Sequence, residues 1–286
     1  MQRVRIEIDG EGVWGRLEGD DVLTDDGRRI ESAHARWLAP ATAATIVAVH
    51  LTYRSRLVEY AVTRIPAQPS YFLKPRGTLN GHLRALRRPA GARFLNYEGE
   101  LAVIVGRRMH GVAQRDVLDH LYGFAPANDV GLHDFRHADR GSMLRVKGED
   151  GFLPIGPAVL TADEWRPDDG FTLRTRLNGE LVQEADERDV IWDYRYLLAD
   201  ITRLVTLEAG DVVLTGTPAN SRPMQPGDVV EVEISGMPVL RNHVEEWDVD
   251  LSGPGEQPEV SANTLHVALA MPEEEAQRRV AGGELG

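Results

Sequence analysis

Hydrophobic and polar residues alternate along much of this chain with a period of two, the pattern that is typical of β-strands. Near the N-terminus, "RVRIEID" and "VWGRLEG" flank the turn "GEG" and predict a hairpin within residues 1–30. Residues 43–51 predict a further strand, and residues 101–105 form an apolar run that suits a core strand. "TLRTRLNGELVQEA" predicts a second hairpin with Asn178 and Gly179 at its tip. We therefore expect a mainly β fold with some α-helix.

Helical periodicity is confined to a few stretches of the sequence. A helix is predicted from Thr52 to the break at Ile65 and Pro66, and others over 113–122, over 193–207 and after the prolines of the C-terminal stretch. Composition shifts divide the chain into three predicted parts: a small N-terminal domain at 1–66, a catalytic domain at 67–250, and an acidic, partly mobile, solvated tail at 251–286.

Composition excludes several classes of protein. The chain has 286 residues, a net charge of −13 and no cysteine. Phosphate binding depends on Lys and Arg, so this charge argues against a general nucleic-acid surface. The absence of cysteine removes disulfides and Cys-based zinc sites. No apolar run approaches a membrane span or a signal peptide, so we expect a cytoplasmic protein that does not bind membranes.

Two glutamates stand at the entrance of the predicted core strand. Glu98 and Glu100 are two residues apart, and alternate positions on a strand share one face. Like charges on a buried face repel, so the pair needs solvent, an Arg or Lys partner, or a divalent cation. Asp129 follows in a second turn-rich segment, and three carboxylates form an all-oxygen set suited to Mg²⁺ or Ca²⁺. Lys147 lies in the Gly-rich "RVKGEDGFLPIGP", from which it could orient a substrate carbonyl or carboxylate.

Other motifs offer weaker alternatives. His133 and His137 have the i, i+4 spacing of a zinc pair on a helix, but Gly131 is a poor helix former. Gly10, Gly12 and Gly15 match the dinucleotide fingerprint formally, yet a strand follows them instead of a helix, which favours a hairpin turn. No Gly-x-Ser-x-Gly motif is present to indicate nucleophilic catalysis.

Six segments in order resemble the fumarylacetoacetate hydrolase superfamily over residues 71–247. The resemblance implies a mixed β-sandwich roll with a small N-terminal α/β domain, and a homodimer. It also implies Mg²⁺ or Mn²⁺ bound by Glu98, Glu100 and Asp129, an active-site Lys147, and Thr217 as a contact of the substrate carboxylate. The segments are "NYEGELAVIVG", "ANDVGLHDF", "KGEDGFLPIGP", "LNGELVQ", "LEAGDVVLTGTPAN" and "PGDVVEVEISGMPVL".

The chain departs from the family pattern at two places. Where the family often has Asn-Tyr-x-x-His-x-x-Glu, this sequence keeps Tyr53, expected to bind substrate, and Glu59, but has Arg56 at the histidine position. An arginine stays protonated and cannot act as a general base. The family's Arg-Asp-x-Gln becomes a segment that begins with His133 and ends with Arg136. His133 or Glu59 is then expected to move protons, and Arg56 and Arg136 to pair with a second substrate carboxylate.

Within the superfamily, the sequence looks closest to the hydroxyheptadienedioate (carboxymethyl-hydroxymuconate) isomerases and decarboxylases of aromatic-acid catabolism. We expect a metal-dependent enzyme acting on a small 2-oxo or 2-hydroxydienoic diacid through an enolate, foremost as an isomerase or tautomerase. Decarboxylation and hydrolysis of a carbon–carbon bond are the alternatives within the same substrate class. A metal-stabilised protein that only binds a small acid is the non-enzymatic alternative.

Overall fold

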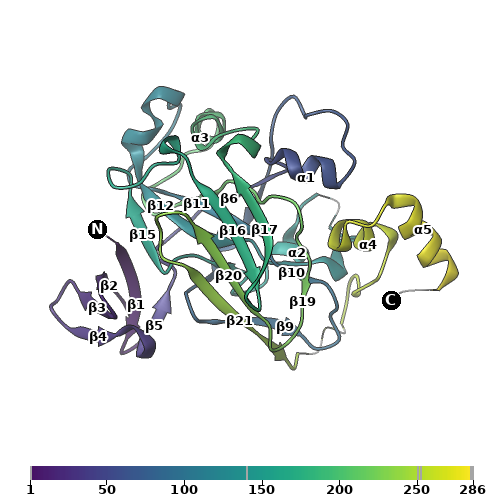
Figure 1. Cartoon of the computed structure of the whole chain (residues 1–286), viewed down its shortest axis with the longest axis horizontal. Helices are drawn as coiled ribbons and strands as arrows, with labels where there is room; N and C mark the ends of the chain where they lie inside the picture. The colour runs from purple at the N-terminus through teal and green to yellow at the C-terminus, as the bar shows by residue number, and fades with distance from the viewer. Residues whose placement is uncertain (1, 140, 250, 252, 284–286) are drawn as a thin grey trace.

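The computed structural model describes residues 2–139, 141–249, 251 and 253–283, and β-strands dominate it (Figure 1). Eleven strands belong to one sheet: β1 (Arg3–Ile8), β2 (Glu11–Glu18), β3 (Asp21–Thr24), β4 (Arg29–Glu31), β5 (Arg36–Leu38), β6 (Ile46–His50), β7 (Ser70–Lys74), β11 (Gly99–Val105), β12 (Leu121–Asn128), β15 (Ala158–Thr161) and β18 (Val212–Leu214). Their order is β4-β3-β2-β1-β15-β12-β11-β18-β6-β7, and β5 pairs with β1.

A second sheet of five strands has the order β17-β16-β20-β21-β9. It comprises β9 (Ala85–Pro89), β16 (Thr172–Leu177), β17 (Glu180–Asp186), β20 (Val229–Ile234) and β21 (Leu240–Trp247). Smaller sheets join β8 (Leu79–Asn80) to β14 (Leu153–Pro154), and β10 (Leu95–Asn96) to β13 (Gly131–Leu132) and β19 (Pro223–Met224).

The α-helices are α1 (Arg54–Glu59), α2 (Leu144–Lys147), α3 (Tyr194–Thr202), α4 (Ala262–Leu269) and α5 (Glu273–Gly282). Short 3₁₀ helices are η1 (Ser32–His34), η2 (Arg76–Thr78), η3 (Gln114–His120), η4 (His133–Phe135), η5 (Pro167–Asp169) and η6 (Glu187–Asp189). The predicted mainly β fold class is confirmed.

Strand β11 is buried on both faces, which explains its uninterrupted apolar sequence. Leu101 and Val103 pack in one core cluster with Leu173 of the five-stranded sheet. Ala102 faces the opposite side and packs in a second cluster with Val146 of α2. The central strand therefore lies between two cores, and its N-terminal end delivers side chains into the interior.

Both predicted hairpins are present. Strands β1 and β2 pair antiparallel through Asp9 (φ 53°) and Gly10 (φ 83°), so the formal dinucleotide fingerprint is a turn. Strands β16 and β17 pair through Asn178 (φ 52°) and Gly179 (φ 84°). Two successive residues with positive φ match the tight turn that suits the twist of a hairpin.

The predicted helices are shorter than expected. Helix α1 ends at Glu59, well before Pro66, because Ala61 adopts a left-handed φ of 52° that a helix cannot continue. The segment 113–122 forms a 3₁₀ helix, not an α-helix, and passes directly into β12. Helix α3 begins after Asp193, whose side chain accepts a hydrogen bond from Tyr196 N at 2.8 Å.

The predicted boundary at residue 66 is not seen in the sheet. Strand β6 pairs parallel with β18 and antiparallel with β7, so it belongs to the main body. Strands β1 to β5 form the end of the same large sheet and join it where β1 pairs with β15. These N-terminal strands and the helices α4 and α5 lie at opposite ends of the molecule (Figure 1).

The prediction of a solvated C-terminal arm is wrong for α4 and α5. Leu265, Ala268 and Ala276 are buried in a cluster with Phe94 of the main body, because one face of each helix is apolar. The expected short helix with a Glu-rich first turn is present as α5. Within the described residues, no helix is long and apolar enough to cross a membrane. The homodimer stays a prediction.

Candidate active site

Three buried carboxylates meet where β11 begins and β12 ends. Gly99 is paired with Asn128, and Asp129 N donates to Glu98 O at 2.8 Å, so the antiparallel register brings the two segments together. Oxygens of Glu98, Glu100 and Asp129 lie within 4.8 Å of one another. The side chains predicted as metal ligands therefore converge, and among the described residues they are the single group of this kind.

Gly99 is needed between the two glutamates. A Cβ at this position would collide with Thr175 Oγ1 of the five-stranded sheet. Its N–H donates to Gln183 Oε1 at 3.1 Å, which fixes this end of β11 against β17. Glu100 accepts a hydrogen bond at 2.7 Å from the N–H of Gly216, in the loop after β18.

Two lysines face the acidic triad. Lys147 Nζ lies 2.7 Å from Glu98 Oε2, 3.1 Å from Asp129 Oδ2 and 2.5 Å from the Asp129 carbonyl oxygen. Lys74 Nζ lies 2.5 Å from Asp129 Oδ1. Both lysine side chains are buried, and they are the only lysines in the sequence. Lys147 was expected from the sequence, whereas Lys74 was missed.

Burial and charge set the protonation of this cluster. Burial raises the pKa of Glu100 well above its usual range, and the neighbouring Asp129 and Glu98 charges add to the effect. Burial also acts to raise the pKa of Asp129, but the charges of Lys147 and Lys74 outweigh it, and the pKa falls below its usual value. Burial lowers the pKa of Lys74, and its ion pair with Asp129 offsets this only in part. The charged form of Glu100 is therefore disfavoured in this cluster, whereas the charged form of Asp129 is favoured.

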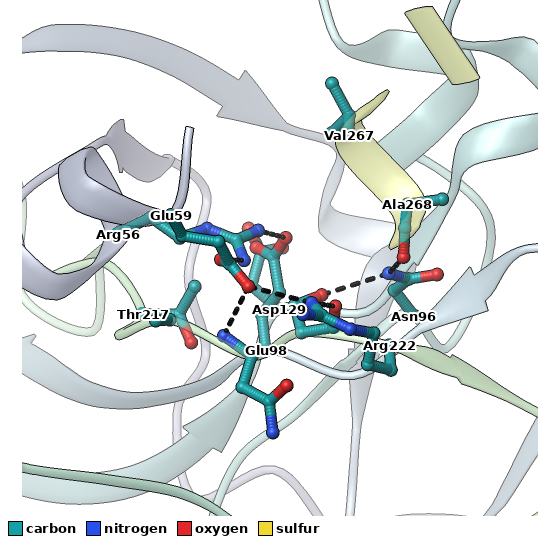
Figure 2. A network of polar contacts seen from close by, with 12 residues as sticks. Arg56, Glu59, Asn96, Glu98, Asp129, Thr217, Arg222, Val267 and Ala268 are labelled. Atoms are coloured by element: carbon teal, nitrogen blue, oxygen red, sulfur yellow. Dashed lines mark hydrogen bonds and ion pairs between the residues drawn. The ribbon is translucent and has the colours of Figure 1, made fainter. Parts of the chain in front are cut away.

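Arg56 links the triad to a second polar group (Figure 2). Its guanidinium lies 3.3 Å from Glu98 Oε1 and 2.7 Å from Glu59 Oε2. Glu59 also accepts from Arg222 Nη1 at 2.8 Å and from Asn220 N at 3.0 Å. The lone pairs of Glu59 are thus engaged, and Glu59 does not line the adjoining cavity. This placement favours a role in holding Arg56 over the predicted role in proton transfer.

The triad opens into a cavity of about 510 Å³. Arg136 lines it and donates to Met143 Sδ at 2.8 Å, and within the described part of the chain it forms no ion pair with a carboxylate. His133 also lines it, and neither ring nitrogen has a hydrogen-bond partner among those residues. Burial lowers the pKa of His133 well below its usual value, aided by Lys147, Arg136 and Arg56, so the imidazole is neutral. Further lining residues are His50, Phe72, Tyr60, Thr217, His266, Val267 and Glu273.

The remaining predicted contacts divide between two places. Thr217 lines the cavity as expected, and its Oγ1 accepts from Gln183 Nε2 at 3.1 Å. Tyr53 does not line this cavity and instead lines a separate cavity of about 240 Å³. The predicted substrate contact of Tyr53 therefore has no support from the geometry. His137 lies outside the triad, and the zinc alternative gains no third ligand within the described residues.

A mainly β fold with buried carboxylates and lysines beside a cavity is the arrangement of a β-roll enzyme. The family described as fumarylacetoacetate hydrolase, C-terminal, matches residues 45–245, and the chain belongs to this family. The prediction of an enzyme of this superfamily is therefore confirmed.

Several similar proteins carry the names of isomerases or tautomerases. The chain is 33% identical over 242 residues to a 4-hydroxyphenylacetate degradation bifunctional isomerase/decarboxylase of Salmonella dublin; the match covers 85% of this chain and 55% of that protein. It is 32% identical over 216 residues to an oxaloacetate tautomerase of Xenopus laevis, covering 72% of this chain and 67% of the relative. A solved 5-carboxymethyl-2-hydroxymuconate delta-isomerase from Mycobacterium smegmatis has a TM-score of 0.76 and 30% identity, covering 87% of this chain and 100% of that one.

Proposed function

We propose that this protein is a divalent-metal-dependent isomerase or tautomerase that acts on an enolisable 2-oxo or 2-hydroxydienoic diacid. The observation that carries the proposal is a carboxylate triad opening into the same cavity as Arg136, which has no carboxylate partner among the described residues. A metal site at one place and a free guanidinium at another match a substrate that carries two acidic ends. The names of the isomerase and tautomerase relatives agree with this class of reaction.

The donor set fits Mg²⁺ or Mn²⁺. Glu98, Glu100 and Asp129 supply only carboxylate oxygens, the ligands that hard cations prefer. Within the described residues Glu100 forms no ion pair and burial disfavours its charged form, which a divalent ion held by the triad would favour. When bound, such an ion supplies Lewis-acid stabilisation of negative charge on a substrate oxygen.

The protein's own side chains perform the proton transfer. The Lys147 ammonium stabilises the negative charge of an enolate beside the triad. The neutral His133 accepts a proton from one substrate carbon and returns it to another, since both its ring nitrogens are free within the described structure. Arg136 binds the second carboxylate. Isomerisation moves one proton and the double bonds, and it needs no further reactant.

Arg56 argues for isomerisation over hydrolysis. Its guanidinium is bound to Glu59 and Glu98, so this position offers no base to activate water. Decarboxylation requires the same enolate and a β-keto carboxylate in the substrate. Product analysis with such a substrate separates decarboxylation from isomerisation.

The two lysines provide a direct test of metal binding. Protein labelled with ¹³C at lysine Cε gives two side-chain signals, because the chain has two lysines. Substoichiometric Mn²⁺ is expected to broaden both signals, and Glu100→Gln to weaken that effect. Glu245→Gln, an exposed glutamate on β21, is the matched control. Sharp lysine signals in the presence of saturating Mn²⁺ would contradict the proposed metal site.

Turnover is tested on 2-hydroxyhepta-2,4-diene-1,7-dioate by the loss of its dienol absorbance, with Mg²⁺ and with chelator. We expect turnover only with the metal. His133→Gln is expected to lower kcat by about 10²-fold or more while Mn²⁺ broadening persists. Arg136→Leu is expected to raise KM about tenfold, through loss of a charge-assisted contact. Arg87→Leu, an exposed arginine on β9, serves as control. Turnover that is unaffected by chelator would overturn the proposal.

A further inference from the structure

The helix α4 contributes one wall of the active-site cavity. His266 and Val267 on α4 line the cavity, as does Glu273 at the start of α5. The matched family region ends at residue 245, so both helices lie beyond it. The M. smegmatis isomerase is covered over its whole length yet matches 87% of this chain, which leaves a part of this chain without a counterpart there. This wall is therefore built from residues outside the matched family region.

The C-terminal end of α4 is fixed to the active site by hydrogen bonds. The last carbonyl groups of a helix have no partner within the helix. Tyr60 Oη donates to Val267 O at 3.0 Å. Asn96 Nδ2 donates to Ala268 O at 2.9 Å (Figure 2). Tyr60 follows α1 and Asn96 belongs to β10, so two separate segments of the main body bind the same helix end. Ala270 then ends the helix in the left-handed conformation.

Apolar packing and a backbone contact secure the same segment. Leu265 and Ala268 pack on Phe94, two residues before Asn96. Upstream of the helix, Glu259 N donates to Asp134 O at 2.8 Å, and Asp134 belongs to the loop that carries His133. Residue 259 and helix α4 are thus bound to the main body near the segment that holds the proposed base, and α4 is a fixed part of the cavity wall.

His266 is oriented for contact with a ligand. Its Nδ1 lies 2.7 Å from Met271 O, and because a carbonyl can only accept, Nδ1 carries the proton. Nε2 lies 3.9 Å from Glu273 Oε1, which is too far for a hydrogen bond, so Nε2 can contact a ligand. The ring packs at 5.3 Å from Tyr60, which in turn lies under Arg56 at 4.7 Å. The contacts that lead from His266 to Glu98 pass through Tyr60 and Arg56, and His266 does not belong to the group of ligand atoms at the triad.

We propose that the C-terminal cap, residues 262–282, determines the length of the substrate, with His266 as the specificity-determining residue that contacts the end of the substrate away from the carboxylate triad. This proposal rests on the proposed function. Arg136 and His266 line the same cavity as the triad. In this proposal, the second carboxylate of a short oxo-diacid held at the triad stays short of α4, whereas the distal carboxylate of a seven-carbon diacid lies on Arg136 and against His266.

The test compares two substrates of different length, 2-hydroxyhepta-2,4-diene-1,7-dioate and oxaloacetate, with the Mg²⁺-loaded full chain. His266→Ala is expected to lower kcat/KM for the seven-carbon substrate about tenfold more than for oxaloacetate, mainly through KM. Val267→Phe, which fills the same part of the cavity, is expected to shift the ratio in the same direction. His243→Ala, a partly exposed histidine on β21, is the control and should leave the ratio unchanged.

A measurement of metal binding distinguishes failure of the length-selecting cap from failure of the proposed function. Calorimetry with Mn²⁺ alone is expected to give the same affinity for wild type and His266→Ala, because His266 does not contact the triad. An equal loss of kcat/KM for both substrates in the variants would refute the length-selecting cap while leaving the proposed function intact. Absence of turnover of either substrate by the wild type would refute the proposed function itself.

Discussion

Replacing Lys74 tests how the negative charge of the carboxylate triad is compensated. Its side chain is fully buried, and its Nζ lies 2.5 Å from Asp129 Oδ1. Lys74→Met keeps the length and most of the apolar surface of the side chain but removes the charge. Removing one partner of a buried ion pair costs about 3–5 kcal/mol of unfolding free energy. We expect about 3 kcal/mol, the lower end, because Lys147 still pairs with Asp129 at 3.1 Å.

Magnesium should reduce this loss. The variant lacks one positive charge beside the triad, so a cation held there meets less repulsion. If the variant binds Mg²⁺ ten times more tightly than the wild type does, saturating Mg²⁺ raises its unfolding free energy by about 1.4 kcal/mol more than that of the wild type. The destabilisation is then expected to be about half as large in Mg²⁺ as in chelator.

Urea unfolding followed by circular dichroism, in chelator and in saturating Mg²⁺, measures both quantities. The control is Leu73→Met, an exposed position next to Lys74 on the same strand, which should change stability by about 0.5 kcal/mol or less. An equal loss for Lys74→Met in both conditions would show that no cation compensates the triad. That result would refute the inference that a cation bound at the triad compensates its negative charge.

Three further changes test the fold. Gly99→Ala places a Cβ against Thr175 and should cost about 1–3 kcal/mol in urea unfolding, and wild-type stability would contradict the close sheet approach. Asp193→Ala removes the N-cap of α3 and should lower stability by about 1 kcal/mol, whereas an unchanged midpoint would argue against the cap. Burial lowers the pKa of His82 to about 4, helped by Arg241. Between about pH 4 and pH 6.5 the unfolded chain therefore binds more protons than the folded chain. The contribution of neutral His82 to the free energy of unfolding is complete above about pH 6.5 and is lost as the pH falls towards 4. His82→Gln should reduce the dependence of the unfolding free energy on pH between these two values. The same pH dependence in variant and wild type would refute the lowered pKa of His82.

Local signals in the sequence predicted the local parts of the fold. Asn178-Gly179 specifies a tight turn through its own conformational preferences, and the apolar run 101–105 specifies a strand buried on both faces. Helix lengths were less well predicted, since Ala61 ends α1 by a backbone conformation that its side chain does not signal. Turn and burial signals are carried by a few adjacent residues, whereas helix ends depend on contacts made elsewhere.

The triad could be predicted but its full surroundings could not. Glu98 and Glu100 are two residues apart, the spacing that places side chains on one face of a strand, and Asp129 completes an all-oxygen ligand set that the resemblance also implies. Lys74 was missed because its strand alternates opposite to expectation: Leu73 is 63% exposed while Lys74 is 4% exposed. The docking of the C-terminal cap was missed because the tail from residue 251 onward has more acidic than basic residues, a composition that is typical of a solvated arm. Long-range packing on Phe94 determines its position, and no local pattern encodes that partner.

The choice of basic residue carries information of its own. Of 32 basic residues, only Lys74 and Lys147 are lysines, and both lie at the triad. All other basic residues are arginines, among them Arg56 beside Glu98 and Arg136 in the cavity wall, and the planar fork of an arginine suits a carboxylate. A compact ammonium can reach between carboxylates that converge within 4.8 Å, whereas a guanidinium spreads its charge over a larger plane. Both lysines of this lysine-poor chain therefore place concentrated positive charge beside the carboxylate triad.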